Sequence, residues 1–171
     1  LFLMDWRATL LAATALPLSI IPTFLVMDFM GYSLNTVTLL ALSLVVGILV
    51  DDAIVEVENI ERHMHMGKPA FQASIEAADE IGLAVIATTF TLIAAFLPTA
   101  FMSGVVGIIF KQFGITASVA VFCSLLVARL VTPMMAAYMM KTHAKPDRGD
   151  GWIMHNYLMV VRGALRRRWI P

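Results

Sequence analysis

Two adjacent aspartates, Asp51 and Asp52, stand near the end of a long apolar run and carry the clearest chemical potential in this chain. No charged residue occurs from 29 to 50, and the sequence stays largely apolar to Val57. A helix of that length can span a bilayer, where one carboxylate at the centre costs about 2.5–3.5 kcal/mol. A carboxyl group reduces this cost by binding a proton, so it can couple to a proton gradient. We predict that the pair is a proton relay.

Helix geometry separates the two carboxylates, because neighbouring residues point about 100° apart. Asp51 should share a face with Val55 and Glu58, and Asp52 with Glu56 and Asn59. Gly47, one turn before Asp51, removes side-chain bulk and should allow close packing of another helix. The divergence argues against an intramembrane aspartic protease, whose two carboxylates share one proton. A buried polar anchor, paired permanently with a base, is the structural alternative.

Arg129 is the second charge inside an apolar segment. It lies 18 residues after Lys111, and Asp51 lies 17 residues after Leu34, so parallel helices would place the two charges at similar depths. We consider Arg129 an electrostatic partner of the acidic pair. The alternative is that its side chain reaches the inner membrane surface.

Composition favours a membrane protein. The chain has 171 residues, of which 60% are hydrophobic and 14% charged, whereas about 25% are charged in soluble domains. The net charge is zero, which gives no electrostatic case for nucleic acid. Glu56, Glu58 and Glu61 should form the solvated inner end of the helix, with Glu56 the main candidate exception. A soft-metal patch at His63-Met64-His65-Met66 is a weak alternative, and we predict no metal site or cofactor, only protons as coupling ions.

The segments predict an all-α membrane protein, a polytopic transmembrane helix bundle occupying residues 1–141. Four spans are expected, at about 8–27, 34–57, 82–101 and 112–140, with a cytoplasmic connector at 58–81 that breaks at Gly67-Lys68-Pro69. Residues 142–171 should form a cytoplasmic linker, a membrane-surface helix and the start of a further span. The sequence reads as a piece of a longer protein.

Loop charges set the orientation of these spans. Ten basic residues fall on one side and Lys111 alone on the other, which makes the basic side cytoplasmic. The ten are Arg7, Arg62, Lys68, Lys141, Lys145, Arg148, Arg162, Arg166, Arg167 and Arg168. The four spans should therefore alternate in direction, starting from the inside.

The sequence closely resembles the resistance–nodulation–division (RND) efflux transporters. Residues 31–64 (GYSLNTVTLLALSLVVGILVDDAIVEVENIERHM) are similar to that family's fourth transmembrane helix, with G-x-x-V-D-D-A-I-V-x-V-E-N as the most specific pattern. The start LFLMDWRATL and the stretches AFLPTAFMSGVVGIIFKQFGIT and VARLVTPMMAAYMMK resemble neighbouring helices of the first transmembrane half. The double aspartate favours the hydrophobe/amphiphile, or multidrug, branch over the heavy-metal branch.

The resemblance implies a proton antiporter of the bacterial inner membrane, a secondary transporter and not an enzyme. It implies a homotrimer that works with a periplasmic adaptor and an outer-membrane channel. Asp51 and Asp52 would be the proton-binding pair, and small amphiphilic substrates would bind outside this segment. Two alternatives stay open: an RND-type exporter of a metal ion or lipid, and a non-transporting membrane sensor or scaffold. The family pattern does not include Arg129.

Overall fold

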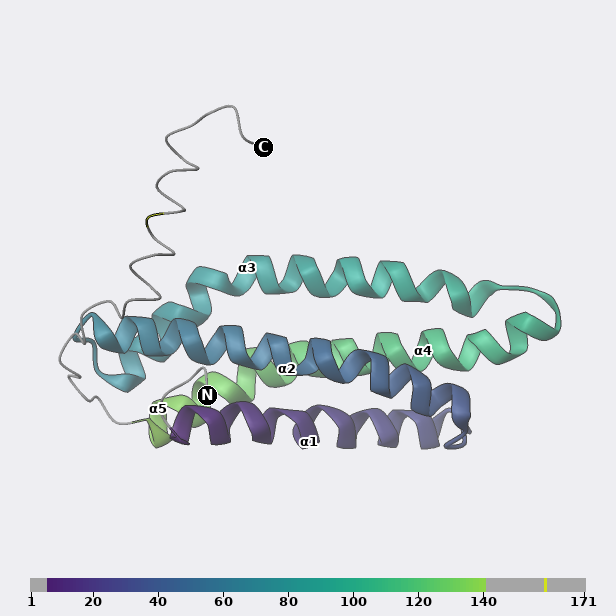
Figure 1. Ribbon diagram of the computed structural model, residues 1–171, viewed down its shortest axis with the longest axis horizontal. Coiled ribbons are helices and arrows are strands. Elements are labelled where there is room, and N and C mark those ends of the chain that lie inside the picture. The colour runs from purple at the N-terminus through teal and green to yellow at the C-terminus, as the bar shows by residue number, and fades with distance from the viewer. Residues whose placement is uncertain (1–5, 141–158, 160–171) are drawn as a thin grey trace, which may run out of the picture.

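The computed structural model describes residues 6–140 and Met159, and these residues form an elongated bundle of helices (Figure 1). The predicted linker, surface helix and further span at 142–171 lie outside the described residues, apart from Met159. In chain order the elements are α1 (Trp6–Phe29), α2 (Thr36–His65), α3 (Ala70–Phe96), the 3₁₀ turn η1 (Leu97–Phe101), α4 (Gly104–Leu126), the π-helical turn η2 (Val127–Val131) and α5 (Thr132–Met139).

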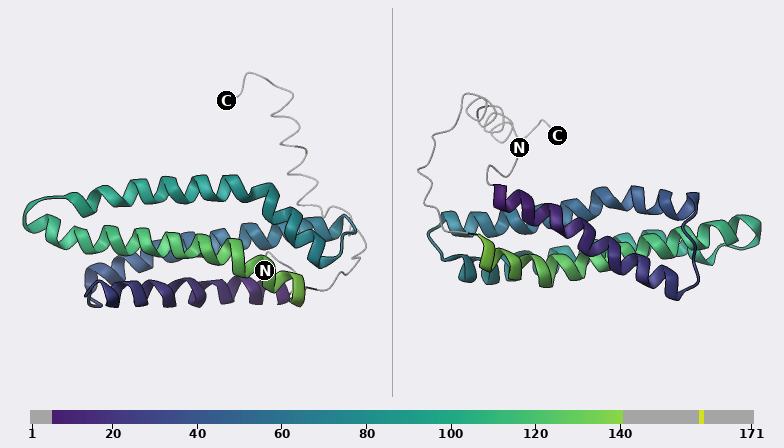
Figure 2. Two further views of the ribbon diagram at one scale, coloured as in Figure 1. Left: turned by 180° about the vertical axis from the view of Figure 1, so that it is seen from behind. Right: turned by 90° about the horizontal axis from the view of Figure 1, so that it is seen from below.

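Four continuous helical segments are long and apolar enough to cross a membrane. They are Trp6–Phe29, Thr36–His65, Ala70–Phe101 and Gly104–Met139, with mean hydropathy between 2.0 and 2.2 in their most apolar windows. Successive segments run in opposite directions along the long axis, so the chain reverses at alternate ends of the bundle (Figures 1 and 2). The predicted fold class, a polytopic bundle of transmembrane helices, is confirmed.

The helix limits differ from the predicted spans at the connector. α2 continues through residues 58–65, and α3 begins at Ala70, so the break covers only the four residues around the Gly67-Lys68-Pro69 turn. Gly67 has φ of +88°, a conformation that glycine adopts without steric cost. Residues 58–81 are thus a tight helical hairpin. Their placement on the cytoplasmic side stays a prediction.

The turn between the third and fourth segments is also shorter than the sequence suggested. α4 begins at Gly104, not near residue 112, and Gly107 lies within the helix. A Cβ atom on Gly107 would collide with the Met102 carbonyl, and one on Gly114 with Thr99 Oγ1 and the Phe96 carbonyl. These two glycines let α4 pack directly against η1 and the end of α3.

The π-helical turn η2 has a local chemical cause in Pro133. Proline has no N–H to donate to the carbonyl of Arg129, and its ring collides with the carbonyl four residues earlier. A π turn relieves this conflict by inserting one residue into the helix. The Thr132 hydroxyl donates to the Val127 carbonyl at 3.3 Å, which satisfies one acceptor of the widened turn. The extra residue changes which face Arg129 occupies.

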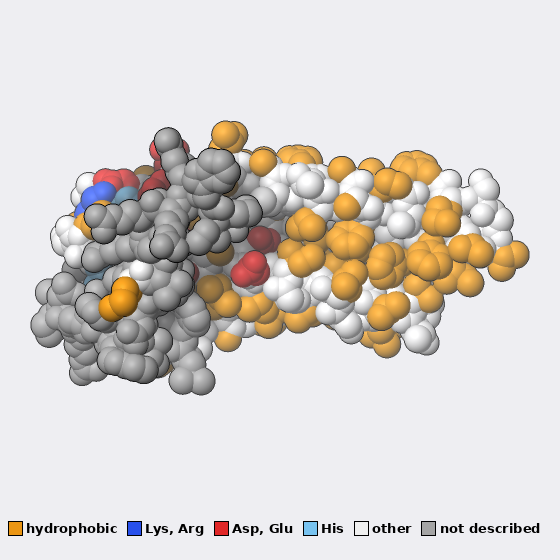
Figure 3. All heavy atoms as spheres, turned by 45° about the horizontal axis from the view of Figure 1, so that its top comes forward, with side chains coloured by type: hydrophobic (Ala, Val, Ile, Leu, Met, Phe, Trp, Pro, Cys, Tyr) orange, Lys and Arg blue, Asp and Glu red, His pale blue; other side chains and the backbone are white. Residues whose placement is uncertain are grey.

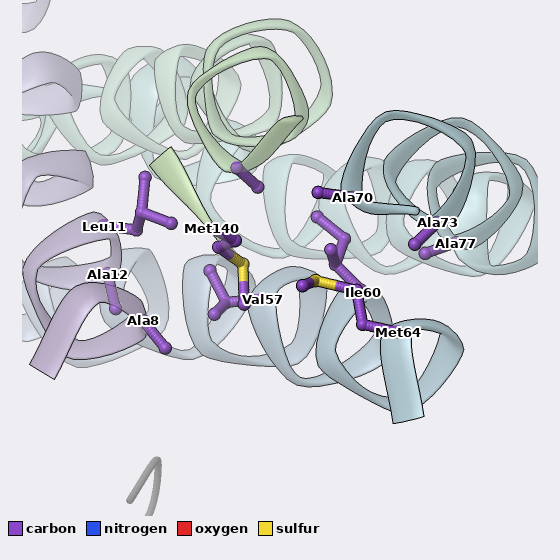
Figure 4. Packing of buried hydrophobic residues seen from close by; sticks show 11 residues of the cluster. Ala8, Leu11, Ala12, Val57, Ile60, Met64, Ala70, Ala73, Ala77 and Met140 are labelled. Carbon is purple, nitrogen blue, oxygen red and sulfur yellow. The ribbon is translucent and has the colours of Figure 1, made fainter. Parts of the chain in front are cut away.

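Small side chains dominate the contacts that hold the helices together. One cluster joins α1, α2, α3 and α5 through alanines that pack around Val57, Ile60 and Met64 (Figure 4). A second joins α2 and α4 through Ala41, Val45, Ala117 and Val121, among others. Small residues allow close approach of helices in a membrane, where packing replaces the hydrophobic driving force. The two clusters therefore hold α2 on both sides of the aspartates, at residues 41–49 and 57–64.

Candidate functional site: the acidic face of α2

The two aspartates point to different surroundings, as helix geometry predicted. Asp51 is exposed, and Asp52 is half-buried. The residues that share the Asp51 face, Gly47, Val55 and Glu58, are all exposed, whereas Glu56 and Asn59 on the Asp52 face are buried. The predicted divergence is confirmed. One carboxylate faces outward from this segment and the other faces into it.

Asp52 has a specific partner on α4. The hydroxyl of Ser124, which is 2% exposed, donates a hydrogen bond of 2.9 Å to Asp52 Oδ2. A serine hydroxyl can donate to a carboxylate and can accept from a protonated carboxyl after rotating. Ser124 can therefore accompany Asp52 through both protonation states. The sequence analysis missed this residue, because a single serine in an apolar helix has no distinctive pattern.

Asp51 and Gly47 form part of an outer surface of the segment. No atom lies within 4 Å of a Cβ built on Gly47, so none of the described helices packs closely there. Figure 3 shows acidic side chains (red) beside an extended hydrophobic face (orange). A close-packing helix at Gly47, and a cationic partner for Asp51, would have to come from outside the segment. Both roles stay predictions.

Arg129 contacts α3. Its guanidinium donates through Nη1 to the backbone carbonyl of Ala78 and lies over Gly82, where a Cβ atom would occupy the same space. Its electrostatic effect falls on Glu56. Arg129 forms no ion pair with Asp51 or Asp52. The contacts of Arg129 are therefore with α3, and an influence on the aspartate pair stays a prediction.

Glu56 is the buried exception among the glutamates. Its side chain is 0% exposed, and neither carboxyl oxygen has a hydrogen-bond partner among the described residues. It lies four residues after Asp52, which places both on one face of α2. The sequence analysis named Glu56 only as a candidate exception. The burial of this face is a tertiary property that the spacing could not reveal.

A polar network ties the inner end of α2 to the start of α3. Asn59 donates to the Ala77 carbonyl at 3.0 Å, and Arg62 pairs with Glu80 at 2.5 Å. His63 Nε2 lies 2.7 Å from Glu80 Oε2, and Lys68 contacts both His63 and Glu76. These bonds fix the hairpin that follows the acidic face. They also engage His63, one of the two buried members of the His-Met patch.

The residues of the predicted soft-metal alternative do not converge. His63 and Met64 are buried, whereas His65 and Met66 are exposed, and His65 pairs with Glu61 at 3.6 Å. Among residues 6–140 and 159, no group of three or more His, Cys, Asp or Glu side chains is arranged to hold a metal ion. The candidate site therefore consists of Asp51, Asp52 and Glu56, which we call the acidic face of α2.

Comparison with known proteins finds a matching family and several similar proteins. The family model described as the AcrB/AcrD/AcrF family matches residues 1–169. The chain is 43% identical over 150 residues to multidrug resistance protein MdtC of Pectobacterium atrosepticum, which covers 88% of this chain and 14% of that protein. It is 44% identical over 169 residues to MdtC of Pantoea ananatis, covering 96% and 16% of the two chains.

A third relative, MdtC of Proteus mirabilis, is 42% identical over 180 residues, covering 99% of this chain and 17% of its own length. The sequence thus spans about a sixth of these relatives. The range matched by the family model, residues 1–169, contains all four apolar helical segments and positions 51 and 52. This chain belongs to the AcrB/AcrD/AcrF family of RND transporters.

Proposed function

We propose that this chain is the first-half transmembrane part of a pump that exports drugs or other amphiphilic compounds in exchange for protons. The observation that carries the proposal is the divergent Asp51–Asp52 pair on a membrane-spanning helix. The relatives are named multidrug resistance proteins, which supports a drug-exporting role. A bacterial inner-membrane location, a homotrimer, and assembly with a periplasmic adaptor and an outer-membrane channel belong to the same proposal.

Proton binding at this pair can supply the required energy. Each elementary charge that crosses 100 mV releases about 2.3 kcal/mol, enough for one or two protons to shift an equilibrium between states a few kcal/mol apart. With Asp52 ionised, the Ser124 hydroxyl donates to Oδ2. When Asp52 binds a proton, the charge disappears and the same contact can reverse its polarity.

The two carboxylates have separate tasks in this mechanism. A change in the protonation state of Asp52 alters its hydrogen bond with Ser124 of α4, inside the segment. Asp51 faces outward, where an ionised carboxylate attracts a cationic group of the second transmembrane half. Protonation would release that attraction and let the two halves shift relative to each other. The bistable element is the packing of helices around α2.

The test is export of a fluorescent amphiphile by the full-length pump, with Asp51→Asn and Asp52→Asn at equal membrane expression. We expect both variants to lose proton-driven export, because asparagine is similar in size but does not titrate. Asp28→Asn, an exposed aspartate at the far end of α1, is the matched control and should export normally.

Retained export in both aspartate variants would contradict the assignment of the coupling site. If the parent pump moves metal ions or lipids but no amphiphile, the proposed substrate class is wrong, and the proposed coupling site is unaffected. Function unchanged by both substitutions, with no transport of any cargo in the parent, would favour the sensor or scaffold alternative.

A further inference from the structure

Glu56 is the feature that the proposed function leaves unexplained. It is fully enclosed by the helices of this segment, and both carboxyl oxygens lack hydrogen bonds among the described residues. Burying a carboxyl group without hydrogen bonds is costly, and ionisable residues inside membranes mark proton and ion pathways. Since the side chain is already enclosed here, a helix from outside the segment cannot reach it without rearrangement.

Glu56 follows Asp52 along α2, and Arg129 follows Ser124 along the helical segment that packs against α2. Along α2, Glu56 follows Asp52 by four residues, one α-helical turn. Along the facing segment, Arg129 follows Ser124 by five residues and lies within the π turn η2. The charge of Arg129 acts on Glu56, although no hydrogen bond or ion pair joins the two side chains.

Arg129 also reaches an opening on the other side. It lines a surface groove between α3 and α5, whose other members include Phe71, Asp79, Pro133 and Tyr138. This groove lies at the end of the bundle where α5 ends, the predicted cytoplasmic end. Arg129, whose charge acts on the enclosed Glu56, therefore also borders a surface that water can occupy.

The other titratable groups on helices that pack against α2 are engaged or distant. Arg7 donates to the Met139 carbonyl, Glu76 and Glu80 belong to the hairpin network, Asp79 and Tyr138 are exposed, and Lys111 lies at the opposite end. Arg129 is the charged group from a neighbouring element that acts on Glu56. Arg129 is thus the positive charge available to balance an ionised Glu56.

We propose that Glu56 is a second proton-binding carboxyl of the transport cycle, which passes protons from Asp52 to the cytoplasmic groove, with Arg129 as its counter-charge. The inference rests on the proposed function. In the transfer, the O–H bond of protonated Asp52 breaks, an O–H bond forms on the Glu56 carboxylate, and Asp52 regains its charge. The proton then leaves Glu56 for water in the groove beside Arg129.

The spacing of Asp52 and Glu56 along the helix allows such a transfer. Side chains four residues apart on a helix have Cβ atoms about 5–6 Å apart, so carboxyl groups at these positions can meet directly or through one water. The guanidinium remains protonated throughout and offers a fixed positive charge. It stabilises the ionised Glu56 after the proton has left, and its bond to the Ala78 carbonyl holds it in place.

The experiment uses the full-length pump with Glu56→Gln, Glu56→Asp and the control Glu61→Gln, a partly exposed glutamate on the same helix. Export is measured in cells, and the infrared bands of protonated carboxyl groups are measured on purified protein during a pH titration. We expect Glu56→Gln to lower proton-driven export about 100-fold and to remove one titrating carboxyl band. Glu56→Asp should retain part of both signals, and Glu61→Gln should export normally.

A double variant separates proton transfer from a purely structural ion pair. If Arg129 and Glu56 only balance each other's charge, Glu56→Gln combined with Arg129→Gln would restore export, and the inference would be wrong. A proton carrier is not restored in this way. If Glu56→Gln exports normally while Asp52→Asn is inactive, the inference about Glu56 is wrong and the proposed function stands. If Asp52→Asn exports normally, the proposed function itself is wrong.

Discussion

At the scale of single residues, the acidic face of α2 separates three carboxyl groups by their surroundings. Asp51 is exposed, Asp52 is half-buried and bonded to Ser124, and Glu56 is enclosed beside Arg129. A carboxyl group's tendency to ionise depends on burial, hydrogen bonds and nearby charge. Three positions within two turns of one helix therefore offer three different environments for a proton. Such a series is suited to movement of a proton along the helix.

The hydrogen bond from Ser124 can be tested by removing the donor. We expect Ser124→Ala to reduce export several-fold, less than Asp52→Asn does, because the carboxyl group remains but loses a bond worth about 1.5–3 kcal/mol to a charged partner. The measurement is the initial rate of dye efflux at equal expression. Ser118→Ala is the matched control, since that buried hydroxyl on α4 has no hydrogen-bond partner among the described residues. Equal effects of the two variants would count against a specific role for Ser124.

At the scale of elements, the shape of α4 and its continuation decides what faces α2. The helix packs closely on η1 through Gly107 and Gly114, and then widens into a π turn before Pro133. The first feature fixes the depth of α4 against its neighbours, and the second rotates Arg129 toward Glu56 and α3. Both features place side chains of one long segment opposite the acidic face.

The close approach at Gly114 predicts a loss of stability on substitution. Gly114→Ala introduces a methyl group into space held by Thr99 and the Phe96 carbonyl, and overpacking of this kind costs about 1–3 kcal/mol. We expect a lower midpoint of thermal unfolding for the full-length protein in detergent. Gly47→Ala is the comparison, because nothing in the described segment lies near its Cβ. If Gly47→Ala destabilises as strongly, a helix outside the segment packs there, as the sequence predicted.

At the scale of the whole molecule, the segment presents large apolar surfaces. Leu25, Leu83, Val105 and Ile108 are 71%, 83%, 77% and 71% exposed. Only 17% of the most apolar window of α3 is buried, whereas 61% of that of α4 is buried. α4 is thus the central helix, and α3 and the outer faces of α1 and α2 are left for lipid or for further helices of the full protein.

These surfaces predict the behaviour of the isolated segment. Residues 1–171 expressed alone should remain monodisperse in detergent and aggregate when the detergent is removed, because exposed apolar patches of this extent drive association in water. Size-exclusion chromatography before and after detergent removal checks this. A monodisperse sample without detergent would show that the exposed faces can be covered within the segment, contrary to the described packing.

The sequence by itself determined the helical membrane architecture, the alternating directions and the divergence of Asp51 and Asp52. These properties follow from local quantities: the length of apolar runs, the distribution of basic residues and the 100° step of a helix. The Gly67-Lys68-Pro69 break was also readable, because glycine and proline act on their own backbone. The start of α4 was placed too late, since glycines at 104 and 107 signal a turn equally well when they serve close packing.

Only the tertiary structure decided which partners the charges have. Ser124 donates to Asp52, and Arg129, within the π turn before Pro133, donates to the Ala78 carbonyl of α3. Sequence spacing gives the direction of a side chain about its own axis, but the facing residue depends on the rotation and depth of another helix. Those are set by the sum of small contacts, such as Gly114 against Thr99, which no local pattern encodes.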